Sequence, residues 1–177
     1  MSSFSFVFAL ALAYHSNHAA AEVHIKTAAA VYGQARAALA EKHFAVAIES
    51  FRKAIEIEPT FEAAYKGLIK AYLDSDQQLE AAAAITRFLE IEPNSPRYRL
   101  VLGQILLELK QPERALAQFS FVLKSDPFNP DALLGFANAA NQAGLPDRAS
   151  EAMQRGRAHY PADNRFKSTA TMEKPNK

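Results

Sequence analysis

Cysteine is missing from this chain of 177 residues, and so is any large excess of charge of one sign. Without cysteine there can be no disulfide framework, no thiolate metal site, no cysteine nucleophile and no lipidated N-terminal cysteine. Basic and acidic residues number 20 and 19, which leaves a formal net charge of +1. Because no strong overall field exists, we expect neither nucleic acid nor an anionic membrane surface as a partner.

Long hydrophobic runs are also scarce, and the one that occurs is at the N-terminus, where residues 4–14 read FSFVFALALAY. This run is too short to span a bilayer, so we expect no stable membrane span. Ala19 and Ala21 fit the A-x-A pattern that signal peptidase accepts, although no lysine or arginine precedes Lys26. Residues 1–21 are therefore predicted to be a signal peptide, or alternatively an apolar helix that covers one end of the fold. Cleavage would make the protein secreted or periplasmic; otherwise we expect it in the cytoplasm.

Catalytic and metal-binding motifs are absent as well. The sequence has no G-x-S-x-G elbow, no glycine-rich phosphate loop and no H-E-x-x-H helix. His15, His18 and His24 are close in sequence but have no nearby cysteine or paired carboxylate, so we expect no metal site there. We therefore expect a protein that is not an enzyme and that needs no cofactor and no metal.

What the sequence does contain is a period of 34 residues. Prolines recur at this spacing, at Pro59, Pro93, Pro127 and Pro161. An alanine stands 12 residues before each proline, at Ala47, Ala81, Ala115 and Ala149. An apolar series, Phe51, Ile85, Phe119 and Met153, keeps the same frame. A fixed period of this length indicates one helical unit that is copied and stacked.

The frame divides the chain into a lead-in at 22–27, an array at 28–163 and a flexible tail at 164–177. The four units of the array are 28–61, 62–95, 96–129 and 130–163. Each unit has two amphipathic helical patterns separated by a polar break; in the second unit the first apolar stripe consists of Tyr65, Leu68, Ile69, Tyr72 and Leu73. Two antiparallel helices per unit are the expected result.

The breaks between the helices contain residues that suit helix ends. Gly144 can adopt the left-handed conformation that ends a helix, and Pro112 and Pro146 have the fixed φ favoured in a first helical turn. Pro96 and Pro130 are expected to begin later units in the same way. The periodic prolines should stop each second helix, because proline disfavours helical conformation in the residue before it. The periodic alanines should lie where two helices cross closely, since a larger residue there would overpack.

With this period and these columns, the chain resembles the tetratricopeptide repeat family, whose 34-residue consensus is a helix-turn-helix with small, apolar and proline positions as seen here. The resemblance implies an all-α, right-handed superhelical solenoid of four antiparallel helix pairs. Gln34 and Gly156 depart from the pattern, because they stand where apolar residues are usual. The last unit differs too: Ser150, Arg157 and His159 replace apolar residues, which is expected of a terminal repeat that faces water.

The resemblance also implies a binding surface, because the first helices of such arrays line a concave groove. Transferred to this sequence, the groove residues are Tyr32, Arg36, Lys66, Lys70, Arg97, Leu100, Gln104, Leu134, Asn138 and Asn141. The early positions are basic and suit an acidic segment of a partner protein, whereas the later ones combine leucines with amides. The carboxylate clamp of chaperone-binding members is incomplete, because its later positions hold Gly67, Val101, Asp131 and Gly135. A cytosolic chaperone cofactor is therefore disfavoured.

We therefore expect a protein-protein interaction adaptor or assembly scaffold that binds a protein or peptide segment in this groove. If the leader is real, proteins similar to this one suggest periplasmic envelope, pilus or secretion assembly, an analogy from fold and address alone. The alternative is a structural subunit that self-associates within a larger complex. The sequence leaves the oligomeric state open.

Overall fold

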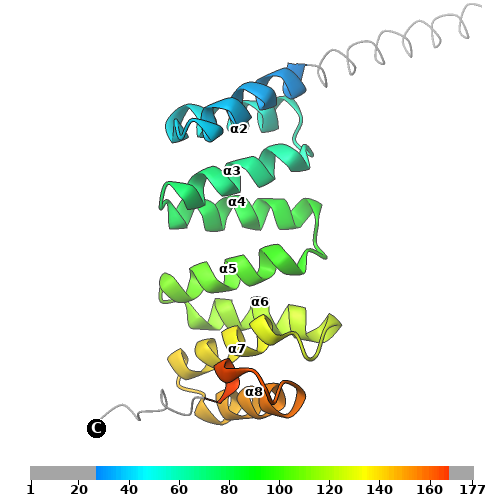
Figure 1. Ribbon diagram of the computed structural model, residues 1–177. Helices are drawn as coiled ribbons and strands as arrows, with labels where there is room; N and C mark the ends of the chain where they lie inside the picture. Colours follow the sequence, from blue (N-terminus) through cyan, green and yellow to red (C-terminus); the bar gives the residue numbers. More distant parts are fainter. Residues whose placement is uncertain (1–26, 168–177) are drawn as a thin grey trace, which may run out of the picture. The chain divides into compact units, whose positions relative to one another are not determined.

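The computed structural model describes residues 27–167, and all regular structure in that range is helical. The chain divides into two compact bodies, Met1–Ala84 and Ile85–Lys177, and their boundary falls inside one helix, α4 (Gln78–Ile91). Figure 1 shows successive helices that reverse direction within each body. The predicted all-α array of antiparallel helix pairs is thus confirmed, while its right-handed superhelical path stays a prediction.

The first body contains a helix described from residue 27 to residue 40, α2 (Phe44–Ile57), α3 (Glu62–Asp74) and the start of α4. The Tyr32 ring of the first helix lies 5.8 Å from the Phe51 ring of α2 and 5.1 Å from the Phe61 ring, between centroids. α2 also packs against α3. Aromatic side chains therefore join the first helix pair to the next helix.

The second body contains the end of α4, α5 (Pro96–Glu108), α6 (Pro112–Ser125), α7 (Pro130–Gln142), α8 (Pro146–His159) and a short 3-10 turn, η1 (Asn164–Phe166). α5 packs against α6, α6 against α7, and α7 against α8. Arg99 of α5 lies 3.5 Å from the centre of the Phe121 ring and donates to the carbonyl of Pro93 and to Gln118 Oε1. It thus stabilises the α5–α6 pair at a position where the second unit has Tyr65, and burial lowers its pKa.

Prolines mark the helix boundaries as the sequence predicts. Pro96 and Pro130 begin α5 and α7, and Pro112 and Pro146 begin α6 and α8. At these first positions the missing N–H costs nothing, because the first helical N–H groups have no partner within the helix. The second helices end at Ile57, Ile91, Ser125 and His159, in each case two residues before a periodic proline.

The turns inside the helix pairs repeat in the same way. Residues at a spacing of 34, Lys42, Asp76, Lys110 and Gly144, all have positive φ, between 57° and 73°. At Gly144 this confirms the predicted left-handed helix end. The next N–H in each turn reaches back five residues, as from Leu145 to the Ala140 carbonyl at 2.8 Å. This is the Schellman arrangement, which satisfies carbonyl groups at the helix end.

The periodic alanines are fully buried. Ala47, Ala81, Ala115 and Ala149 each have an exposed fraction of 0%, and the periodic residues Phe51, Ile85 and Phe119 are buried as well. Full burial of a residue with only a methyl group is what a close helix crossing requires. Ser150, Arg157 and His159 of the last unit are not buried.

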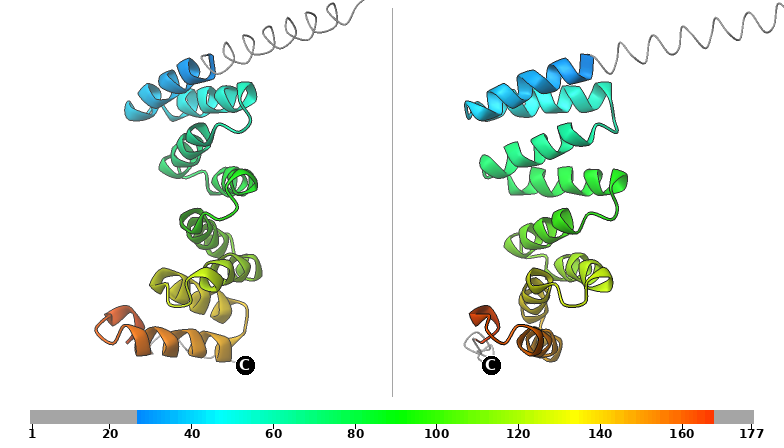
Figure 2. Two further views of the ribbon diagram at one scale, coloured as in Figure 1. Left: turned by 90° about the vertical axis from the view of Figure 1, so that its right-hand side faces the viewer. Right: turned by 45° about the vertical axis from the view of Figure 1, so that its right-hand side comes forward.

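The predicted flexible tail was placed too early. Its first residues, 164–166, form η1, which packs against α8 (Figure 2). The Phe166 side chain is 0% exposed. Arg165 joins Asp163 to Asp131 of α7, with N–O distances of 2.8 and 2.9 Å. Hydrogen bonds from the side chain and the backbone N–H of Arg165 hold the pKa of Asp163 below its usual range. Sequence periodicity missed this turn because three residues are too few to show a stripe.

Several predictions concern residues outside the described range, namely the signal peptide at 1–21, most of the lead-in, the three N-terminal histidines and the end of the tail. Between residues 27 and 167, no helix is long and apolar enough to cross a membrane. No group of three histidine, cysteine, aspartate or glutamate residues in this range is placed to hold a metal ion.

Candidate functional site

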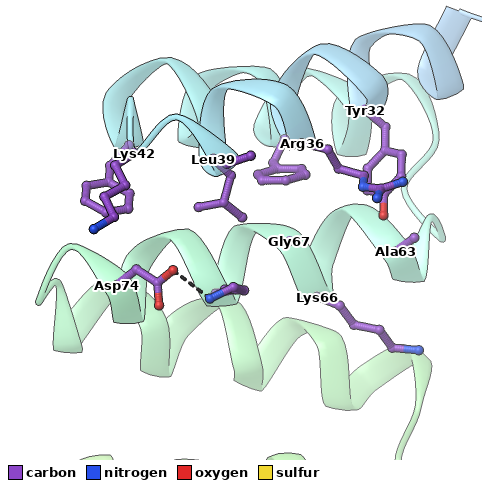
Figure 3. Close-up of a pocket in the computed structure, with 12 residues that line it drawn as sticks. Tyr32, Arg36, Leu39, Lys42, Ala63, Lys66, Gly67 and Asp74 are labelled. Atoms are coloured by element: carbon purple, nitrogen blue, oxygen red, sulfur yellow. Dashed lines mark hydrogen bonds and ion pairs between the residues drawn. The ribbon is translucent and has the colours of Figure 1, made fainter.

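A hollow in the first body lies between its first helix and α3. We call it the basic pocket, and it has a volume of about 900 Å³. Its lining residues come from the first helix, the following turn, α2 and α3: Tyr32, Arg36, Leu39, Ala40, Lys42, Phe44, Phe51, Ala63, Lys66, Gly67, Lys70 and Asp74. Figure 3 shows Tyr32 and Leu39 extending from the first helix towards α3. Four basic side chains and one carboxylate surround an aromatic and aliphatic wall.

The four cations of the basic pocket differ in their partners. Lys66 pairs with Glu62, and Lys70 pairs with Asp74, both at 2.7 Å; the second pair is drawn in Figure 3. Arg36 lies 5.9 Å from the centre of the Tyr32 ring, a contact that leaves its hydrogen-bond donors available. Neither Arg36 nor Lys42 has a carboxylate within 4.0 Å among the residues that the structure describes. An acidic ligand would therefore meet two cations that are not already neutralised.

Gly67 lines the basic pocket, and its lack of a side chain leaves space for the Phe51 ring. A Cβ atom on Gly67 would lie 2.4 Å from two carbon atoms of the Phe51 ring, closer than real contacts allow. Gly67 stands in the middle of α3, where glycine lowers helix stability by about 0.5–1 kcal/mol relative to alanine. The local cost is offset by close packing of the Phe51 ring beneath the pocket.

The second body has a hollow of the same design between α5 and α7. This amide pocket has a volume of about 370 Å³ and is lined by Leu100, Val101, Gln104, Phe119, Asp131, Leu134, Gly135 and Asn138. Phe119 and Gly135 stand 68 residues after Phe51 and Gly67, two full periods, and repeat their close approach at 2.3 Å. The repeat therefore builds equivalent hollows, and the side chains at their edges determine how they differ.

The structure gathers eight of the ten predicted groove residues around these two hollows. Tyr32, Arg36, Lys66 and Lys70 line the basic pocket, and Leu100, Gln104, Leu134 and Asn138 line the amide pocket. Arg97 and Asn141 are exposed on α5 and α7 but line neither of them. The predicted contrast between a basic region and a region of leucines and amides is visible in the two linings, the second of which also includes Asp131, and binding at either place remains a prediction.

Sequence reasoning missed several lining residues of the basic pocket, among them Leu39, Lys42, Phe51 and Gly67. Phe51 is 0% exposed, and its place in the periodic apolar series gives no sign that its ring borders a pocket. Gly67 itself is the signal that could have indicated these residues. A glycine inside a helix that recurs two periods later, as Gly135, indicates close packing at that position.

Comparisons with known proteins agree with this architecture. A family model described as tetratricopeptide repeat matches residues 8–158. No curated protein matches the sequence significantly. Among solved structures, MamA 41-end from Desulfovibrio magneticus RS-1 is 18% identical and has a TM-score of 0.67, with 78% of each chain covered.

Other solved structures are similar at the same level. A crystal structure of MamA is 18% identical, with a TM-score of 0.65 and coverage of 76% of this chain and 78% of that one. A tetratricopeptide repeat protein from Parabacteroides merdae is 17% identical, with a TM-score of 0.70; the match covers 80% of this chain and 56% of that protein. At such identities the likeness concerns the fold alone.

Proposed function

Because the chain belongs to the tetratricopeptide repeat family, whose members are generally non-enzymatic scaffolds for protein-protein interaction, we propose that it is an adaptor that binds an acidic partner segment in the basic pocket. The observation that carries the proposal is the lining of that pocket, where Arg36, Lys42, Lys66 and Lys70 surround a wall of aromatic and aliphatic side chains. Such a surface suits a peptide that alternates carboxylates with apolar residues.

The pocket combines two sources of affinity. Arg36 can donate two parallel hydrogen bonds to a carboxylate, which are stronger than bonds between neutral groups. Leu39, Phe44 and the Phe51 ring offer apolar area to a neighbouring side chain of the ligand. A volume of about 900 Å³ is large enough for several residues of an extended peptide. The setting that we favour, assembly of a periplasmic envelope, pilus or secretion complex, rests on the predicted leader and on analogy.

Charge reversal tests this proposal. We expect Lys66→Glu combined with Lys70→Glu to weaken binding of a labelled peptide that alternates glutamate with leucine by about tenfold or more, because the two new carboxylates, with Glu62 and Asp74 now unpaired beside them, repel an acidic ligand. The melting temperature should change little, because exposed ion pairs at i,i+4 contribute only about 0.3–0.5 kcal/mol. Fluorescence anisotropy measures the first effect and circular dichroism the second.

The matched control is Arg52→Glu combined with Lys53→Glu, an equal change of charge on exposed residues of α2 that do not line the pocket. We expect this control to retain most of the affinity. If both double variants lose affinity equally, only overall charge matters and the assignment of the pocket is wrong. If neither loses affinity, the acidic segment does not bind there. If only the pocket variant loses affinity, affinity capture of proteins from the native compartment with the wild type and both variants would identify the partner.

A further inference from the structure

A pocket of a different kind lies between the second helices of the last two units. This outer pocket has a volume of about 270 Å³ and shares no lining residue with the amide pocket of the same body. Its apolar wall includes Leu123 of α6 and Phe136 of α7. Its charged residues are Lys124 of α6 and Arg148, Glu151 and Arg155 of α8. Three cations and one carboxylate leave a net charge of +2 around a small hollow.

The three cations of the outer pocket are not neutralised by the protein. Within residues 27–167, no carboxylate lies within 4.0 Å of the side-chain nitrogens of Lys124, Arg148 or Arg155. Glu151 lines the same hollow but forms no ion pair with them. Lys66 and Lys70 of the basic pocket, by contrast, both have acidic partners at 2.7 Å. The charge of the outer pocket is therefore available to a ligand.

Two of these cations are held in place. The Arg148 guanidinium lies 5.0 Å from the centre of the Phe136 ring. Arg155 donates from Nη2 to the Pro127 carbonyl at 2.6 Å. Both contacts restrict a long side chain while leaving other N–H donors of the guanidinium available. A cation that is ordered before binding loses less conformational entropy when a ligand arrives.

The repeat frame shows that packing alone does not require this set of residues. Units that need a residue for packing tend to keep its type, whereas the outer-pocket positions change from unit to unit. In successive units the position of Lys124 holds Glu56 and Glu90, that of Arg148 holds Glu80 and Arg114, and that of Phe136 holds Leu68 and Leu102. Among the units compared, the basic residues and the aromatic ring thus come together only around α6, α7 and α8.

We propose that the outer pocket binds a dianionic phosphate group. A volume of about 270 Å³ is small for a peptide segment but accommodates one phosphate with a small organic group attached. A net charge of +2 is matched by phosphate near neutral pH, whereas a single carboxylate would neutralise only half of it. Arginine forms bidentate hydrogen bonds with phosphate oxygens, and the Phe136 ring beside Arg148 provides an apolar surface for an attached group.

Isothermal titration calorimetry on the full chain at constant ionic strength tests this site with three probes: inorganic phosphate, phenyl phosphate and acetate. We expect both phosphates to bind and acetate to bind at least about tenfold more weakly, since it offers one charge in place of two. Equal affinity for the two phosphates would identify free phosphate as the ligand. Tighter binding of phenyl phosphate would identify a phosphate monoester.

The variants locate the site. Arg148→Gln and Lys124→Gln should each weaken phosphate binding by about tenfold. The matched control is Arg114→Gln, which changes the residue one period earlier, at the same place in α6, and should leave affinity unchanged. Circular dichroism checks that all three variants are folded. Absence of phosphate binding, acetate binding as tight as phosphate, or an equal loss in Arg114→Gln would each overturn the proposal.

Discussion

Single residues explain how aromatic rings fit between the helices of this array. The Phe119 ring lies against both Gly103 and Gly135, where an added Cβ would come within 2.6 and 2.3 Å of it. Gly67 and Gly156 leave space in the same way for the rings of Phe51 and Phe166, because an added Cβ would lie 2.4 and 2.1 Å from ring carbons. Gly156 departs from the apolar pattern of its column for this reason, because only a residue without a side chain leaves space for the Phe166 ring.

The glycine positions yield a prediction at this scale. We expect Gly67→Ala to lower the free energy of unfolding by about 1–3 kcal/mol, because the new methyl group would force the buried Phe51 ring out of its position. Urea denaturation followed by circular dichroism measures the loss. The same displacement should change the wall of the basic pocket, since both residues line it.

Gly33→Ala provides the control. Gly33 also lies inside a helix, but a Cβ there would meet nothing within 4 Å. Helix propensity alone then applies, and we expect a gain of about 0.5–1 kcal/mol. Loss of stability in both variants would mean that contact with the aromatic ring does not explain the glycine at position 67.

At the scale of helices and turns, one backbone conformation repeats with different residues. Lys42, Asp76 and Lys110 adopt the left-handed region with φ near 60°, where their Cβ atoms are unfavourable, and Gly144 adopts it without that cost. The turn is imposed by the helices on either side, because its hydrogen bonds must end one helix before the next begins. Local preference is therefore overridden in three of these four turns.

The difference between lysine and glycine at positive φ yields a second prediction about stability. We expect Lys110→Gly to raise the free energy of unfolding by up to about 1 kcal/mol, because relief of the strained φ exceeds the added entropy of the unfolded chain. The reciprocal variant, Gly144→Ala, should lower it by about 1 kcal/mol. Thermal denaturation of both variants beside wild type measures the two shifts. Shifts of the same sign would contradict this account.

At the scale of the whole molecule, the last described helix is covered by a short turn. α6 packs against the next first helix, α7, whereas α8 packs against η1, with Phe166 buried opposite Gly156. The turn thus covers the face of α8 that carries Gly156, as an apolar helix face in a repeat array requires.

The last prediction concerns the contact between Phe166 and α8. Phe166→Ala should lower the free energy of unfolding by about 3–5 kcal/mol, as is typical of a fully buried phenylalanine. Phe128→Ala is the control, since its ring stacks on His159 at 4.3 Å but is 43% exposed, and it should cost less than about 1.5 kcal/mol. Amide hydrogen exchange would show whether the loss is concentrated in α8. Equal effects of the two substitutions would mean that Phe166 does not stabilise α8.

Much of the fold was predictable because it depends on local chemistry. Proline lacks an N–H and has a fixed φ, so helix starts at Pro96 and Pro130 could be predicted without contacts. The candidate site was predictable only where repeat register places a side chain, as for Arg36 and Lys70. Lys42, Phe51 and the outer pocket were missed, because which residues gather around a hollow depends on the packing of helices that are distant in sequence.

The sequence by itself determined the all-α repeat, its 34-residue period and its helix boundaries, since these follow from residue types at fixed spacing. Tertiary structure alone decided that Gly67 admits the Phe51 ring, that Lys66 and Lys70 already have acidic partners, and that Phe166 is buried against α8. The physical reason is that spacing records how one helix is built, whereas ion pairs, ring contacts and hollows exist only between helices.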